Sequence, residues 1–232
     1  MRLRRFVAAG ALLALCGAGL LAPPAGAMSL RPLNVSDLVK QATHIVRGTV
    51  ASVREGIDQN RLPYTEVEVT VSETVKGSAG TTLTFRQFGL QTPRPSENGH
   101  KYIGLIAGMP RYAAGDQVFL FLGPVSSIGY RTTIGLGQGH FALRGGNFQN
   151  DANNAGLFRN VGYGNHNLSD KEKSMTAVQQ GAVGAETFVG LVRRAVSGNW
   201  WAALGPSAPR PRGPRPIASA GPSVTAEGGL IQ

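Results

Sequence analysis

Cysteine is almost absent from this chain of 232 residues, because its single cysteine, Cys16, lies in an apolar segment near the N-terminus. We interpret that segment as a signal peptide, so the mature chain is expected to contain no cysteine. Disulfide bonds are then excluded, although an exported protein is free to form them. Thiol and redox chemistry are excluded too, and the apolar core alone must hold the fold together.

Motifs that report catalysis by their spacing are also missing. The histidines never lie within one helical turn of each other, which excludes the His-Glu-x-x-His zinc motif; they are His44, His100, His140 and His166. No Gly-x-Ser-x-Gly sequence marks a serine hydrolase. Glu66 and Glu68 alternate with valines, as is typical of a solvated strand face. We predict no catalytic, cofactor-binding or metal-binding residues, no cofactor, and a protein that is not an enzyme.

Oxygen-bearing side chains do gather in the loop "GNFQNDANNAG". They are Asn147, Asn150, Asp151, Asn153 and Asn154. Only Asp151 is anionic, and the ordered calcium-loop pattern with its terminal glutamate is absent. The loop is therefore interpreted as a surface turn rather than a calcium site.

The N-terminus has the order of parts of a secretory signal peptide. Arginines precede an apolar run over residues 6–22, and "PPAGAM" then supplies small residues for cleavage before Met28. The run is shorter than the roughly 20 residues of a membrane-spanning helix, which favours cleavage over an uncleaved anchor, the alternative. We expect an exported protein, periplasmic or secreted, with no stable membrane insertion after cleavage.

The composition divides the rest of the chain in two. We expect residues 28–201 to form a single domain. Residues 202–232 are rich in Pro, Gly, Ala and Arg and are expected to form a disordered tail. Acidic residues are scarce: 13 stand against 23 Lys and Arg, of which three belong to the signal peptide, leaving a net charge of +7. This charge is compatible with acidic partners such as nucleic acid, anionic lipid or polyanionic glycans, but the absence of any run of four Lys or Arg favours a solvated surface with a basic bias. The expected partner is an unidentified protein or a polyanion or glycan. Nucleic acid is not expected as the physiological partner, because the protein is exported.

Alternating apolar residues predict a mainly β fold. Strands are expected at "HIVRGTVASVR", "YTEVEVTVSETV", "TTLTFRQF" and "GDQVFLFLGP", with shorter ones at "YRTTIGL", "GHFAL" and "GLFRNV". In the first strand the apolar phase slips at Ala51 and Val53, which indicates a bulge or bend after Gly48. Both faces of "GDQVFLFLGP" are apolar, so this strand is expected to be covered on both sides.

Two helices flank these strands. Asn34 or Ser36 is expected to cap a short helix with Leu38, Val39 and Ala42 on one side. "AETFVGLVRRAV" places apolar residues at helical spacing in a C-terminal amphipathic helix. The predicted fold is a small closed or partly open OB-like β-barrel with these two helices, and a β-sandwich is the alternative.

The glycine-rich stretch "GLGQGHFALRGG" resembles a phosphate-binding loop but lacks its register. His140 occupies the position that the dinucleotide fingerprint reserves for its third glycine. We instead expect a strand in which Gly135, Gly137 and Gly139 share one face. The C-terminal helix, or Phe119 or Phe121, is expected to approach that face closely.

Several of these segments resemble a group of exported bacterial proteins of uncharacterised function. The resemblance covers about Leu33 to Leu143 and rests on "ATHIVRGTVASVRE", "YTEVEVTVSETVKG", "LTFRQFG", "GDQVFLFLGP" and "IGLGQGHFAL". The order of helix and strands is also distantly similar to the netrin-like and metalloproteinase-inhibitor type of OB barrel. That resemblance implies a five- or six-stranded barrel. It does not imply protease inhibition, which in that family uses an N-terminal cysteine that this chain lacks.

The leading functional hypothesis is an exported, non-enzymatic binding module. One alternative is an OB-type barrel that binds an oligosaccharide or a polyanion. An oligosaccharide would be bound by exposed aromatic rings such as those of Tyr64, Phe85 and Tyr130. A second alternative is an enzyme whose site is assembled only by folding, with His140 beside Asp116 or Glu73.

Overall fold

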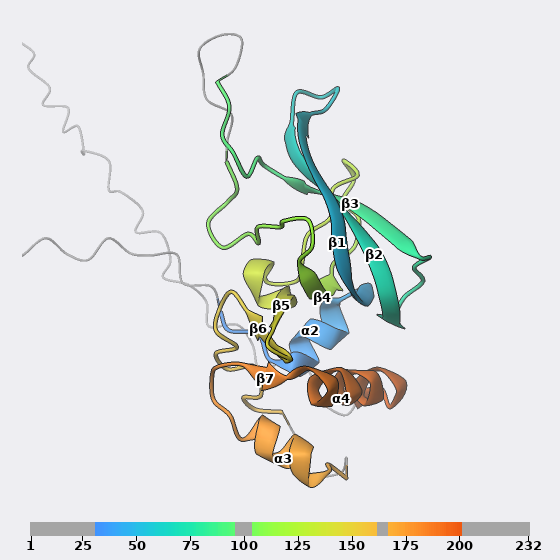
Figure 1. Ribbon diagram of the computed structural model, residues 1–232, viewed down its shortest axis with the longest axis vertical. Helices are drawn as coiled ribbons and strands as arrows, with labels where there is room; N and C mark the ends of the chain where they lie inside the picture. The colour runs from blue at the N-terminus through green and yellow to red at the C-terminus, as the bar shows by residue number, and fades with distance from the viewer. Residues whose placement is uncertain (1–30, 96–103, 162–166, 201–232) are drawn as a thin grey trace, which may run out of the picture.

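The computed structural model describes residues 31–95, 104–161 and 167–200 (Figure 1). The predicted signal peptide and tail lie outside them. The strands form one antiparallel sheet in the order β3-β2-β1-β4-β5-β6-β7. They are β1 (His44–Ile57), β2 (Pro63–Lys76), β3 (Thr82–Phe88), β4 (Gln117–Leu122), β5 (His140–Arg144), β6 (Asn147–Asn150) and β7 (Val183–Gly184). The mainly β prediction is confirmed, and the alternative two-sheet sandwich does not form in the described part of the chain.

The first strands of the sheet curl into a partly open barrel. β1 and β2 pair along their whole length, but Val50 pairs with Val69 and Ser52 with Glu68, so Ala51 is the extra residue of a bulge. This is the bulge that the phase slip predicts, and bulges of this kind coil a strand. The sheet does not close, because β3 forms one edge and β7 the other.

The loop after β4 connects β3 to β4 across the opening of the curled strands β3-β2-β1-β4. The Arg131 N–H donates to the carbonyl of Arg86 in β3 at 2.7 Å, and the Ile134 N–H donates to Phe121 in β4 at 2.8 Å. The predicted strand at "YRTTIGL" is nevertheless wrong, since that stretch forms only an isolated bridge between Leu122 and Thr133. The loop therefore links both sides of the opening without becoming a regular strand.

Two apolar clusters lie on opposite faces of the sheet. The barrel core lies on the concave face and consists of Val46, Val50, Val67, Val69, Phe85, Tyr112, Val118, Leu120 and Leu122. The helix-side core lies on the other face and is centred on Leu38, Val39, Ile45, Phe119, Phe121, Phe141, Phe148, Phe188, Val189, Leu191 and Val192. β4 contributes alternate residues to both cores, so its predicted burial on two sides is confirmed.

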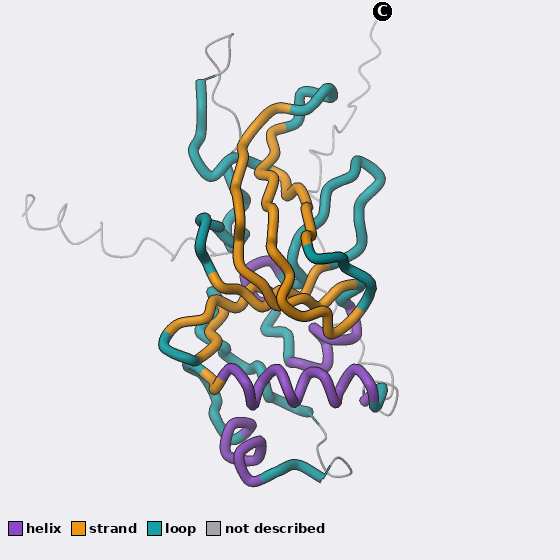
Figure 2. Tube along the Cα trace, turned by 45° about the vertical axis from the view of Figure 1, so that its right-hand side comes forward, coloured by secondary structure: helices purple, strands orange, loops and turns teal. Residues whose placement is uncertain are grey.

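Helices cover the second core. α2 (Val35–Gln41) is capped by Asn34, whose side chain accepts from the Asp37 N–H, as one of the two predicted caps requires. α4 (Ala185–Ser197) buries the predicted apolar positions. Figure 2 shows α4 below the strands and the shorter α3 (Asp170–Thr176) beyond it. The predicted helices and their buried sides are confirmed, whereas α3 was not expected.

The glycine-rich stretch differs from its prediction. Leu136–Gly139 forms a single 3-10 turn, η2, and Gly135 before it has a left-handed φ of 64°, so the three glycines do not share a strand face. Close packing is nevertheless present: a Cβ at Gly139 would lie 2.6 Å from the Ile134 carbonyl oxygen. The strand predicted at "GLFRNV" is also wrong, because residues 156–160 form turns.

Candidate functional site

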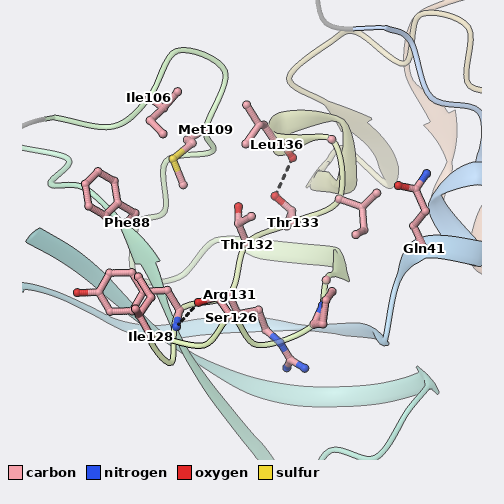
Figure 3. Close-up of a pocket in the computed structure, with 15 residues that line it drawn as sticks. Gln41, Phe88, Ile106, Met109, Ser126, Ile128, Arg131, Thr132, Thr133 and Leu136 are labelled. Carbon is pink, nitrogen blue, oxygen red and sulfur yellow. Dashed lines mark hydrogen bonds between the residues drawn. The ribbon is translucent and has the colours of Figure 1, made fainter. Parts of the chain in front are cut away.

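An apolar cleft opens beside the loop that follows β4. Its volume is about 530 Å³, within the range of small-molecule sites. Figure 3 shows Phe88, Ile106 and Met109 along one side of the cleft, across from Leu136. Gln41 and Ile128 lie at opposite ends in this view. The walls thus come from the end of β3, the segment before β4, the loop after β4, and the end of α2.

The apolar side chains at the rim are unusually exposed for their type. Ile106 is 46% exposed and Ile128 is 48% exposed, and Val125, next to the lining residue Pro124, is 57% exposed. A polar atom also lies in the wall: the Thr132 hydroxyl is buried and has no hydrogen-bond partner among the described residues. Leaving a buried polar group unpaired typically costs about 1–3 kcal/mol. An apolar opening with an isolated polar group is the usual composition of a ligand site.

Arg131 is the only charged residue among the described residues that line the cleft, and its guanidinium bonds to a partner outside it. Its guanidinium donates to the Nδ1 of His44 at 2.9 Å, so the ring proton lies on Nε2, which donates to the Ser78 carbonyl at 3.1 Å. Burial, followed by the neighbouring Arg131, lowers the pKa of His44. The cationic group is therefore engaged with a neutral histidine.

A smaller polar cavity adjoins the cleft. Its volume is about 330 Å³, and it shares Ile128 and Tyr130 with the cleft. The rest of its lining consists of Asp58, Gln59, Asn60, Tyr64, Arg86 and Gly129. The Arg86 guanidinium lies 4.3 Å from the centre of the Tyr64 ring, and its Nε donates to Glu66 at 2.7 Å. The hydrogen bond to Glu66 raises the pKa of Arg86.

Asp58 organises the turn at the edge of this cavity. One carboxylate oxygen accepts from the backbone N–H groups of Asn60 and Leu62, and the other accepts from the Tyr130 hydroxyl at 3.0 Å. These hydrogen bonds lower the pKa of Asp58, and the bond from the Leu62 N–H has the largest effect. The Asp58 carboxylate is therefore ionised at neutral pH. Burial, together with the bond to Asp58, raises the pKa of Tyr130 to about 12. The Asp58 carboxylate is thus already occupied by the protein.

The three aromatic residues named from the sequence are only partly brought together. Tyr64 and Tyr130 line the same polar cavity. Phe85 lies in the barrel core instead, with its ring 5.7 Å from that of Tyr112 in an edge-on contact. The alternation of β3 points Phe85 inward, whereas Tyr64 at the start of β2 remains partly exposed.

His140 does share a cavity with one of its two predicted carboxylate partners. Asp116 lines this cavity, whose volume is about 410 Å³, and Asp151 comes nearest, at 3.6 Å from the His140 Nδ1. Neither ring nitrogen has a hydrogen-bond partner in the described part of the chain. Glu73, the other predicted partner, pairs with Arg193 instead. Within the described residues, no three His, Cys, Asp or Glu side chains are arranged to hold a metal ion.

The asparagine-rich loop is more buried than its sequence predicts. Asn150 and Asn154 are buried, and their side-chain oxygens accept from backbone N–H groups within the loop. The Asn154 amide also donates to the carbonyls of Phe148 and Gly181. These two side chains therefore hold the loop together, and the surface-turn interpretation is wrong for them.

Apart from Tyr130, the residues of the cleft are not identified by the sequence analysis. Ile106, Met109 and Ile128 lie in stretches without apolar periodicity, and only folding brings them next to Phe88 and Leu136. The one available signal was the presence of large apolar side chains among the glycines and prolines of residues 104–136.

Comparison with known proteins assigns no family to this fold and site. No family model matches the chain, and no curated protein matches it significantly. In the described residues, no helix is long and apolar enough to cross a membrane. The molecule is thus defined by its own geometry, as a partly open antiparallel β-barrel with a helical layer, an apolar cleft and an adjoining polar cavity.

Proposed function

We propose that this protein is an exported, non-enzymatic binding module whose ligand lies in the apolar cleft. The observation that carries the proposal is the cleft of about 530 Å³ with Ile106 and Ile128 half exposed at its rim. When an apolar ligand covers such side chains, the free energy of binding becomes more favourable by about 25 cal/mol per Å² of apolar surface removed from water.

Binding is favoured over catalysis by the composition of the His140 cavity. The nearest carboxylate to His140, that of Asp151, is 3.6 Å away and makes no hydrogen bond to it, and none of the described residues that line this cavity is a Ser, Thr, Cys or Lys nucleophile. A polyanion is likewise not favoured, because Arg131 in the cleft donates to His44 and Arg86 in the adjoining polar cavity donates to Glu66.

The cleft is tested with N-phenyl-1-naphthylamine, a neutral apolar dye that fluoresces when it leaves water. We expect saturable binding to the protein, and about tenfold weaker binding to the Ile106→Ser and Ile128→Ser variants. Each substitution removes the equivalent of about two buried methylene groups, or roughly 1.5 kcal/mol. Val178→Ser is the matched control, since Val178 is 38% exposed and lies outside the cleft.

Circular dichroism should show all three variants folded, because the altered side chains are exposed. Equal dye affinities for wild type, Ile106→Ser and Ile128→Ser would refute the proposal. So would a loss in Val178→Ser as large as that in the cleft variants.

A glycan ligand is the second candidate function, and the polar cavity favours it. Gln59 and Asn60 are exposed there and supply side-chain amides that donate and accept hydrogen bonds, and Tyr64 beside them is partly exposed. Binding of a free sugar with undiminished affinity in the Ile106→Ser variant would support this candidate over the apolar ligand.

A further inference from the structure

The apolar cleft and the polar cavity lie side by side and share two lining residues. Both are lined by Ile128 and Tyr130, so a molecule that fills the cleft as far as Ile128 reaches the entrance of the polar cavity. The volumes are about 530 Å³ and 330 Å³, respectively. A ligand that uses both must therefore change from apolar to polar along its length.

The polar end offers hydrogen bonds but no uncompensated charge. Asp58 is satisfied by two backbone N–H groups and by Tyr130. Glu66 accepts from Arg86 at 2.7 Å and lies 4.0 Å from Arg54. A charged head group would have to compete with these pairs, whereas a neutral one would not.

The hydrogen-bonding groups at this end suit hydroxyls. Gln59 and Asn60 lie on an exposed turn, and their amides both donate and accept, as hydroxyl groups do. The side chain of Arg86 is 43% exposed, and its terminal nitrogens are further donors. Arg86 also covers the Tyr64 ring at 4.3 Å, so a cationic head group would meet another cation where it would seek the ring.

The other end accepts hydrocarbon. Figure 3 shows Phe88, Ile106, Met109 and Leu136 around the cleft, and the one charged residue that lines it in the described part of the chain, Arg131, donates to His44. We propose that the two cavities together bind one amphiphilic molecule, with its hydrocarbon chain in the cleft and a neutral, hydroxyl-rich head group against Gln59, Asn60 and Arg86. This inference rests on the proposed function of the cleft and names its ligand class.

The test uses three octyl amphiphiles, each below its micelle concentration, which compete with the bound dye. They are octyl glucoside, octyl sulfate and octyltrimethylammonium. We expect octyl glucoside to bind about tenfold more tightly than either charged amphiphile, because its hydroxyls can bond to Gln59, Asn60 and Arg86 while each charged head group meets a like charge, Asp58 for the sulfate and Arg86 for the ammonium. Glucose alone is expected to displace no dye.

Two sets of variants separate the ends of the site. The Gln59→Ala/Asn60→Ala double variant is expected to bind octyl glucoside about fivefold more weakly, through the loss of hydrogen bonds, with unchanged dye affinity. Ile106→Ser is expected to weaken all three amphiphiles alike. Gln180→Ala, which alters an exposed amide outside the site, is the matched control and should change nothing.

The outcomes distinguish the two proposals. If the three amphiphiles bind equally, if a charged one binds most tightly, or if the double amide variant retains full affinity for octyl glucoside, the amphiphile inference is wrong while the cleft function stands. If the wild-type protein binds neither dye nor amphiphile, the proposed function itself is overturned.

Discussion

Gly139 lets three stretches of backbone meet where η2 passes into β5. A Cβ at this position would lie 2.6 Å from the Ile134 oxygen, 2.9 Å from the Ile134 nitrogen and 3.1 Å from the Phe121 oxygen. All three are backbone atoms, which cannot swing away as the end of a side chain can. The Ile134 N–H also donates to Phe121 here, in one of the bonds by which the loop after β4 connects β3 to β4.

We therefore predict that Gly139→Ala lowers the free energy of unfolding by about 2 kcal/mol, the typical effect of overpacking. Gly190→Ala is the matched control, because Gly190 lies within α4 and a Cβ there would meet nothing within 4 Å. This change should raise the free energy of unfolding by about 0.5–1 kcal/mol through helix propensity. Urea denaturation measures both, and equal effects of the two substitutions would contradict the packing at Gly139.

His44 makes stability depend on pH. Its pKa is lowered from 6.5 in the folded protein, by burial and by Arg131. Below about pH 6.5 the unfolded chain therefore binds more protons than the folded one. The free energy of unfolding is expected to fall as the pH drops through 6.5 towards the lowered folded value.

The matching prediction is that His44→Gln flattens this dependence between pH 7.5 and 5.5, measured by urea denaturation at each pH. Asp58 does not interfere, because its pKa is lowered from 3.8 and its contribution is lost only at more acidic pH. An unchanged pH dependence in His44→Gln would show that the histidine is not responsible.

At the scale of elements, α3 is a short helix held at its start by a capping box. The Ser169 hydroxyl accepts from the Glu172 N–H, and the Glu172 carboxylate accepts from the Ser169 N–H. The same carboxylate accepts from Arg194 at 3.0 Å and so ties α3 to α4. The "SDKE" sequence carries this signature and would have predicted the helix.

Replacing Ser169 by Ala is expected to lower the free energy of unfolding by about 1 kcal/mol, the usual effect of losing an N-cap. Ser174→Ala, in the same helix, is the control. Ser174 is exposed, and its hydroxyl bonds only to the carbonyl of Asp170 one turn earlier, so its loss should change stability little. Urea denaturation of both variants provides the comparison, and a loss of stability confined to Ser174→Ala would contradict the cap.

Elements with strong periodicity were predictable from the sequence. β2, β4 and α4 each repeat apolar residues at the spacing of their own structure, and the slip in β1 marked its bulge. β6 could not be predicted, because its four residues include only one apolar side chain, Phe148. η2 could not be predicted either, because alternate glycines fit a strand face and a tight turn equally well.

The site was far less predictable than the fold. Phe88 and Ile128 are 40 positions apart in the sequence, and the loop that carries Ile128 has no periodic pattern. Phe88 and Ile128 line one cleft because the sheet curls and because the backbone N–H groups of Arg131 and Ile134 form hydrogen bonds across its opening. His140 and Asp116 were foreseen as neighbours, but the approach of Asp151 depends on Gly137, where a Cβ would lie 2.7 Å from the Asp151 carboxylate.

At the scale of the whole molecule, one sheet supports both apolar cores. In β4, Leu120 belongs to the barrel core, and Phe121, the next residue, belongs to the helix-side core. In β1, Ile45 and Val46 divide in the same way. Because these strands cannot leave one core and remain in the other, the cores are expected to unfold together.

The expected result is one cooperative transition seen identically by two probes. Far-UV circular dichroism follows all the secondary structure, the strands included, and the fluorescence of Trp200, which packs against the helix-side core, follows the helical layer alone in a Trp201→Phe background. Leu120→Ala and Phe121→Ala, one in each core, should each lower the free energy of unfolding by about 3 kcal/mol. Each should also move both transitions together. If Leu120→Ala shifted only the dichroism, or Phe121→Ala only the fluorescence, the barrel and the helical layer would be separate folding units. The shared strands would then have to be able to part from one core while held by the other.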